Sequence, residues 1–148
     1  KKASWDSYEP RCLHDSSLSL STPSVLACDI GDTELGYEMF RKACGIDLSN
    51  DDPHSSDAGI HAASYGGLWQ CVVYGFGGLR MVGGKLRVDP KLPKAWNSLR
   101  YTLFWQGQKL VITAGKESVT VEKQGDQAVS LEICGQKITV TDCVTVKL

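Results

Sequence analysis

The sequence has almost no net charge, because its 16 lysines and arginines are balanced by 17 aspartates and glutamates. Proteins that bind nucleic acid or an anionic membrane carry an excess of basic residues on one surface, and this composition gives no sign of one. The sequence also lacks any C-x-x-C pair, the spacing typical of zinc sites and redox-active dithiols. We therefore expect no nucleic acid partner, no membrane surface as partner and no metal.

Charge is absent altogether from residues 58–79, a stretch long enough to raise the question of a membrane span. Six glycines, together with His61, Ser64 and Gln70, make it a poor spanning helix. We expect instead a helix that is buried on nearly all sides. Residues 1–11 have no apolar core, so no signal peptide is predicted.

The six cysteines are even in number, which is compatible with disulfides. Cys28 and Cys71, however, lie inside apolar runs, where a cysteine behaves as a small buried hydrophobic residue. We therefore favour reduced thiols and a cytoplasmic location.

The first half of the chain carries helix signals. Thr22 followed by Pro23 is typical of a helix start, and Gly31 of a helix end. Asp32 is placed to cap a second helix, which ends at Gly45. We predict helices at 22–31, 32–45 and 61–74 and a loop at 46–57, with apolar faces formed by Val25, Leu26 and Ile30 in the first helix and by Leu35, Met39, Phe40 and Ala43 in the second.

After Gly78 the hydrophobic period changes to two residues. Gly83-Gly84 lies between the runs 79–82 and 85–88 and is a strong signal of a two-residue hairpin. Apolar and polar residues then alternate in further short runs that are separated by glycines. We predict an antiparallel meander folded into two packed sheets, with strands in 99–105, 119–121, 129–133, 138–140 and 144–148.

Three segments together resemble one known family. They are YEPRCLHDSSLS at 8–19, GIHAASYGGLW at 59–69 and VVYGFGGLRM at 72–81. In combination they resemble the C-terminal end of glycoside hydrolase family 65, whose members include inverting disaccharide phosphorylases. The resemblance covers most of residues 5–110.

The resemblance implies an α+β multidomain fragment. Residues 1–78 match the last helices of the (α/α)6 catalytic barrel of the family, and residues 79–148 match its C-terminal antiparallel β-sandwich. Three helices with an almost uncharged third member also leave apolar surface without a partner in this sequence. We therefore expect the natural N-terminus to lie upstream.

Ser16 and Ser17 match the serine pair that the phosphorylases use around phosphate. Taken alone, serines at this place are more simply interpreted as helix caps or turn residues. Several hydroxyls beside a helix N-terminus nevertheless suit an anion. The resemblance favours phosphate binding by both.

His61 and Ser64 match the family pattern in the second segment, and His61 matches its phosphate-contacting histidine. The resemblance therefore implies that both residues bind phosphate. A lone histidine in an apolar stretch is more often structural, although a helix start favours an anion. Asp15 is unexpected beside a phosphate site, because a carboxylate repels phosphate. We expect it to orient neighbouring groups, whereas a carboxylate aimed at the sugar would instead activate water.

No segment matches the stretch that carries the catalytic glutamate of the family, which protonates the glycosidic oxygen. We therefore expect the general acid upstream, no catalytic residue in this chain and no activity from the chain alone. Four acidic residues are interpreted as exposed charges and not as substitutes for it: Asp29, Glu34, Glu38 and Asp47.

The resemblance implies the C-terminal part of an inverting phosphorylase of an α-glucosidic disaccharide. Inorganic phosphate is the co-substrate, β-glucose 1-phosphate is the product, and no metal or organic cofactor is needed. The whole protein is expected to be a homodimer. Two alternatives stay open, a hydrolase of the same family that uses water and a non-catalytic sandwich that binds carbohydrate through Tyr101, Trp96 or Trp105 or is purely structural.

Overall fold

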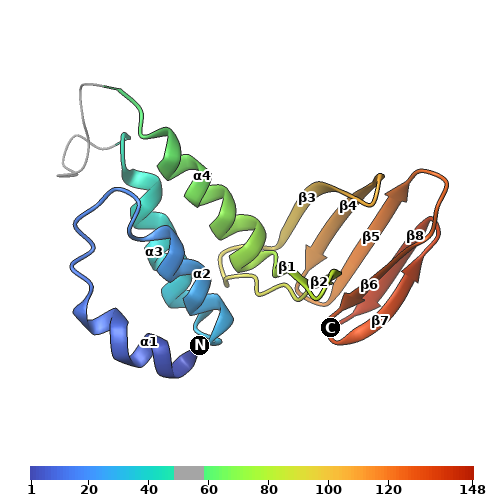
Figure 1. Ribbon diagram of the computed structural model, residues 1–148, viewed down its shortest axis with the longest axis horizontal. Coiled ribbons are helices and arrows are strands. Elements are labelled where there is room, and N and C mark those ends of the chain that lie inside the picture. The colour runs from blue at the N-terminus through green and yellow to red at the C-terminus, as the bar shows by residue number, and fades with distance from the viewer. Residues whose placement is uncertain (49–58) are drawn as a thin grey trace. The chain divides into compact units, whose positions relative to one another are not determined.

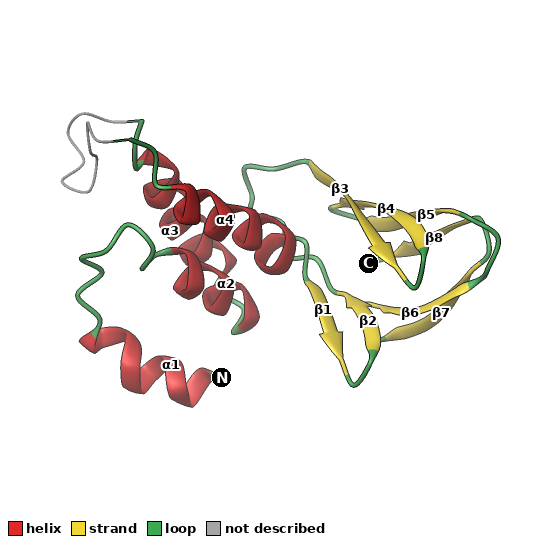
Figure 2. Cartoon of the chain, turned by 45° about the horizontal axis from the view of Figure 1, so that its top comes forward, coloured by secondary structure: helices red, strands yellow, loops and turns green. Residues whose placement is uncertain are grey.

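The computed structural model describes residues 1–48 and 59–148, which separate into two units, Lys1–Phe76 and Gly77–Leu148. Outside residues 49–58, the regular elements of the first unit are helices and those of the second are strands (Figures 1 and 2). Helices followed by two sheets rich in antiparallel pairs confirm the predicted fold class. No helix in the described ranges is long and apolar enough to cross a membrane.

In its described residues the first unit has four α-helices and two shorter helical turns. They are α1 (Lys2–Tyr8), a 3₁₀ turn (Glu9–Arg11), α2 (Ser21–Asp29), α3 (Thr33–Gly45), α4 (Ala62–Gln70) and a π-helical turn (Cys71–Phe76). The three predicted helices are present, whereas α1 was not predicted. Of the predicted loop at 46–57, residues 49–57 lie outside the described part of the chain.

The start of α3 confirms the predicted cap. Asp32 accepts a hydrogen bond from the Leu35 backbone N–H, with 3.1 Å between Oδ1 and N. An aspartate at this position satisfies one of the free N–H groups of the first turn. Met39 and Ala43 are buried as predicted, and Phe40 is half-buried against Phe76, with ring centroids 5.5 Å apart.

The prediction for the buried face of α2 was wrong. Its buried residues are Ser24, Ala27 and Cys28, while Leu26 is exposed. The reason is a close approach to α3, where a Cβ on Gly36 would lie 2.8 Å from the Ser24 carbonyl oxygen. Ser24 Oγ donates to the Gly36 carbonyl at 2.7 Å across the same contact. Only small side chains fit between backbones this close, so Leu26 is left exposed while Val25 and Ile30 are half-buried.

Helix α4 is less buried than the sequence predicts. Within it only Ser64 is buried, whereas Tyr65 and Trp69 are 39% and 55% exposed. In the described residues α4 packs against α2 and α3 and the π-helical turn, which cover one side of it. The uncharged sequence of α4 therefore leaves an exposed aromatic surface.

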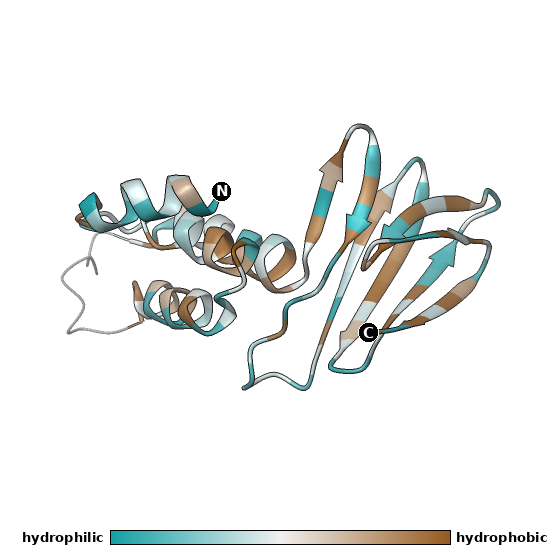
Figure 3. Cartoon of the chain, turned by 90° about the horizontal axis from the view of Figure 1, so that it is seen from below, coloured by the Kyte–Doolittle hydropathy of each residue, from teal (hydrophilic) through white to brown (hydrophobic). Residues whose placement is uncertain are grey.

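The second unit is made of two four-stranded sheets. Their orders are β1-β2-β6-β7 and β3-β4-β5-β8. The strands are β1 (Leu79–Val82), β2 (Lys85–Val88), β3 (Ser98–Trp105), β4 (Gln108–Gly115), β5 (Ser118–Gln124), β6 (Val129–Ile133), β7 (Gln136–Val140) and β8 (Cys143–Lys147). Hydrophobic and hydrophilic residues alternate along them (Figure 3), and the hydrophobic set includes the fully buried Val88, Leu110, Ile112, Val121 and Ile133.

The predicted hairpin at Gly83-Gly84 is confirmed. Val82 pairs with Lys85, and the two glycines between them have φ values of 57° and 72°. Positive φ at both central residues is the geometry of a type I′ turn, which matches the twist of the flanking strands.

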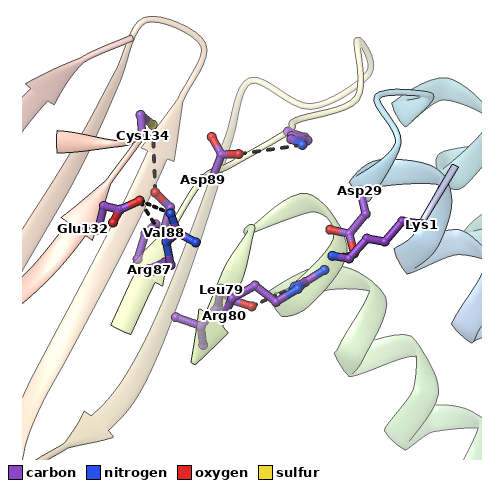
Figure 4. Close-up of polar contacts among 10 residues, drawn as sticks. Lys1, Asp29, Leu79, Arg80, Arg87, Val88, Asp89, Glu132 and Cys134 are labelled. Atoms are coloured by element: carbon purple, nitrogen blue, oxygen red, sulfur yellow. Dashed lines mark hydrogen bonds and ion pairs between the residues drawn. The ribbon is translucent and has the colours of Figure 1, made fainter. Parts of the chain in front are cut away.

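The predicted simple meander was wrong in its connections. β2 pairs with β6 in parallel, and the chain forms three strands of the other sheet between them. Arg87 Nε of β2 donates to Glu132 Oε1 of β6 at 2.8 Å (Figure 4). Just after β6, the Cys134 backbone N–H donates to the carbonyl of Val88, the last residue of β2, at 2.9 Å. These pairings join segments more than 40 residues apart, which local patterns do not specify.

Candidate functional site

One hydrogen bond joins the two segments that carry the predicted site. Ser64 Oγ donates to the Ser17 carbonyl oxygen at 3.2 Å, across 47 residues of sequence. The Ser64 side chain is buried, with 3% exposure. Its hydroxyl is therefore occupied in holding the serine segment, and it serves as a structural link between the two motifs.

One face of α4 and of the π-helical turn after it packs against the start of α2. A Cβ on Gly67 would lie 2.6 Å from Ser21 Oγ, so only glycine fits there without movement. Cys71 Sγ donates to the Ser21 carbonyl at 3.3 Å. Ser64, Gly67 and Cys71 recur at intervals of three and four, which places them on one face of a helix. This face fixes the position of the α4 N-terminus beside the serine segment.

The serine segment forms a tight turn before α2. Ser16 Oγ accepts the Leu18 backbone N–H at 3.3 Å, and Ser19 Oγ donates to the Ser16 carbonyl at 2.8 Å. Ser16 is exposed and Ser17 is half-buried. Neither is the N-cap of α2, which is Leu20 without a side-chain capping bond. The Ser16 hydroxyl thus has a local role in the turn and also faces solvent.

His61 is the N-cap residue of α4, so it lies where the helix dipole favours an anion. Its carbonyl accepts the Ser64 N–H at 2.8 Å, which ties it to the first turn of the helix. Ser64 therefore connects the two motifs. Its side chain bonds to Ser17, and its backbone N–H bonds to His61 within the first turn of α4. The structure brings the predicted residues of both motifs into one region of the helical unit.

Asp47 was predicted to be an exposed charge, and this was wrong. Its side chain is 6% exposed, and its two oxygens contact His61, Oδ1 at 2.6 Å from Nδ1 and Oδ2 at 2.7 Å from the backbone nitrogen. The hydrogen bond from the His61 backbone, and then that from its ring, keeps the pKa of Asp47 below its ordinary value. Asp47 follows the C-cap Ile46 of α3 and has a left-handed backbone, with a φ of 66°.

The other three acidic residues that were predicted to be exposed differ in their exposure. Glu34 and Glu38 are exposed as predicted, and the Glu38 carboxylate lies 2.8 Å from Lys42 Nζ. That hydrogen bond lowers the pKa of Glu38, the opposite of what a general acid needs. Asp29 is only partly exposed, because it pairs with Lys1 at 2.8 Å (Figure 4). Glu38 therefore does not resemble a proton donor.

Asp15 is exposed, and its neighbour His14 has a left-handed backbone with a φ of 51°. His14 Nε2 lies 3.1 Å from Glu9 Oε1, while its Nδ1 is buried without a hydrogen bond. His14 and Glu9 line a pocket of about 630 Å³ that also includes Trp5 and Tyr8 of α1, whereas Asp15 does not line it. The structure thus shows a histidine–carboxylate contact between His14 and Glu9.

The described residues contain no group of three or more His, Cys, Asp or Glu side chains arranged to hold a metal ion. None of the six cysteines forms a disulfide in the structure. Burial raises the pKa of the Cys71 thiol and also that of Cys44, so both favour the protonated form.

Two family models match adjoining parts of the chain. Residues 1–70 match the central catalytic domain of glycosyl hydrolase family 65, and residues 79–140 match its C-terminal domain. The chain belongs to glycosyl hydrolase family 65. The resemblance seen in the sequence is thereby confirmed.

The relatives of this family 65 chain include proteins named as kojibiose and trehalose phosphorylases. It is 40% identical over 132 residues to kojibiose phosphorylase of Halothermothrix orenii, covering 89% of this chain and 17% of that protein. It is 42% identical over 118 residues to α,α-trehalose phosphorylase of Thermoanaerobacter brockii, covering 80% and 15%. A solved structure described as a candidate kojibiose phosphorylase from the human microbiome aligns with a TM-score of 0.87 and 31% identity, over 97% of this chain and 19% of that one. The family 65 chain thus spans less than a fifth of these relatives.

Proposed function

We propose that this chain is the C-terminal part of an inverting disaccharide phosphorylase. The whole protein cleaves an α-glucosidic disaccharide with inorganic phosphate and releases β-glucose 1-phosphate. Support comes from the family membership and from relatives named as kojibiose and trehalose phosphorylases. Phosphate is a co-substrate here, and the proposal needs no metal or organic cofactor.

The observation that carries this proposal is the hydrogen bond between Ser64 and Ser17. It places a serine turn beside the N-terminus of α4, where His61 lies. Hydroxyls, backbone N–H groups and a histidine at a helix start are groups that bind an oxyanion. We assign phosphate contacts to Ser16, Ser17 and His61, with Ser64 acting as the link between them and Asp15 as an orienting group.

In this mechanism phosphate attacks the anomeric carbon from the face opposite the leaving group, which inverts the configuration. The residues of this chain bind and aim the phosphate. A glutamate from the rest of the catalytic barrel protonates the leaving oxygen. The chain supplies the nucleophile-binding half of the active site.

We further propose that residues 1–78 are the last helices of an (α/α)6 barrel and residues 79–148 its C-terminal β-sandwich. The exposed Tyr65 and Trp69 of α4 are apolar surface that the rest of the barrel would cover. A cytoplasmic homodimer is the expected form of the whole protein.

The test is an assay of the full-length protein against a panel of α-linked glucose disaccharides, with and without inorganic phosphate. We expect sugar release that depends on phosphate and yields β-glucose 1-phosphate. Release of free glucose alone, at the same rate without phosphate, would show the hydrolase and refute the proposal.

A further inference from the structure

Asp47 holds His61 at two points. One carboxylate oxygen accepts the backbone N–H and the other contacts the ring at Nδ1, at 2.7 and 2.6 Å. A single side chain thereby fixes both where the residue lies and how its ring is rotated. The His61 side chain remains 32% exposed while that of Asp47 is 6% exposed. The carboxylate is shielded, and the ring keeps access to a ligand.

The backbone around Asp47 directs the carboxylate toward α4. Helix α3 ends at Gly45, Ile46 is buried, and Asp47 has a left-handed φ of 66°. Among residues other than glycine, aspartate and asparagine tolerate this conformation best. The position therefore favours glycine, asparagine or aspartate, and of these only aspartate supplies a carboxylate for His61.

The contact also determines which ring nitrogen carries a hydrogen. The hydrogen bonds from His61 lower the pKa of Asp47, so the carboxylate is ionised at neutral pH and only accepts. His61 Nδ1 must then be the donor, which leaves Nε2 as the ring atom for an outside ligand. When Nε2 is protonated and donates to an anion, the Asp47 carboxylate offsets the charge of the ring.

We propose that Asp47 is a positioning residue that locks the His61 ring with Nδ1 toward the carboxylate and Nε2 toward phosphate. This inference rests on the proposed function, in which His61 contacts phosphate. Asp47 acts through His61 and not by touching phosphate, because a carboxylate repels that anion. Replacing Asp47 should therefore weaken phosphate binding only while His61 is present.

The first variant for the test is Asp47→Asn in the full-length protein. Asparagine keeps the left-handed backbone and one acceptor for the His61 N–H, but it turns an NH₂ donor toward Nδ1. We expect the affinity for inorganic phosphate, measured by calorimetry, to fall about tenfold, the scale on which an outer partner of a liganding histidine acts. The KM for disaccharide and the melting temperature should stay close to those of the wild type.

A double-mutant cycle separates positioning from a structural effect. Asp47→Asn added to His61→Ala should weaken phosphate binding no further than His61→Ala alone. Asp29→Asn is the matched control, since it removes another partly buried carboxylate of the helical unit and should leave phosphate affinity unchanged.

The outcomes distinguish the two proposals. If wild type binds no phosphate, or His61→Ala binds it normally, both the phosphate site and this inference fail. If His61→Ala weakens binding and Asp47→Asn does not, only the positioning role is overturned. An equal loss from Asp47→Asn in both backgrounds would also overturn it, because the effect would then not pass through His61.

Discussion

The two units of this protein achieve their packing by different means. In the helical unit, helices meet through small side chains and hydrogen bonds from side chain to backbone, such as Ser64 to Ser17 and Ser24 to Gly36. In the strand unit, branched aliphatic residues such as Ile112 fill a continuous core. The candidate site lies in the helical unit, where the serine turn meets α4 through such a polar contact. We therefore expect changes there to act on binding, and changes in the strand unit to act on stability.

The largest expected effect is the loss of catalytic activity when the helical unit is separated from the rest of the barrel. The 148-residue chain should show no phosphorolysis, since general acid catalysis alone contributes about 10²- to 10⁴-fold and the proton donor is expected elsewhere. The measurement is release of glucose 1-phosphate by the purified chain next to the full-length protein. Phosphate-dependent release by the chain would show that the helical unit holds a complete active site.

In the strand unit the largest effect should be on folding. Ile112→Ala removes a fully buried side chain from β4 and should lower the free energy of unfolding by about 2–5 kcal/mol. Phe104→Ala on β3 is the control, because that side chain is 75% exposed and its loss should cost little. Denaturant titration of both variants checks this. Equal destabilisation would mean that the strand core is not where stability is concentrated.

In the helical unit His61→Ala should act on binding. Loss of a hydrogen bond to a charged group costs roughly 1.5–3 kcal/mol, which is about one to two orders of magnitude in phosphate affinity. Phosphate titrations of the full-length protein at saturating disaccharide measure it, with a thermal melt alongside. A variant that melts early but binds phosphate normally would make His61 a structural residue.

The smallest effect should come from the polar surface of the strand unit. Arg87 and Glu132 join β2 to β6, but the Arg87 side chain is 47% exposed. A double-mutant cycle with alanine at both positions should give a coupling energy of about 0.2–1 kcal/mol. A coupling well above that would mean that polar contacts support the strand unit as they do the helical one.

Features set by neighbouring residues were predictable from the sequence. The Asp32 cap and the Gly83-Gly84 hairpin depend on local hydrogen bonds and backbone conformations, and both are confirmed. The buried face of α2 was not predictable, because it depends on how closely Gly36 lets α3 approach. The parallel pairing of β2 with β6 depends equally on distant segments.

The candidate site shows the same division. His61 and the pair Ser16 and Ser17 were predicted from short sequence motifs, because histidine and serine side chains can bind an anion. Asp47 was missed because its contact with His61 depends on a left-handed turn 14 residues earlier, which no pattern of hydrophobicity shows. The role of Ser64 as a link was also hidden, since its partner is a backbone carbonyl of another segment.

The helix face that packs α4 against α2 consists of Ser64, Gly67 and Cys71. Because its last residue is a cysteine, opening of the site can be followed by the rate of thiol labelling. Cys71 is fully buried, its thiol donates to Ser21, and burial raises its pKa. A thiol in that state is inert toward alkylating reagents until the helices separate. The rate at which an alkylating reagent labels Cys71 therefore reports how often the serine turn and the start of α4 separate. Bound phosphate should lower that labelling rate.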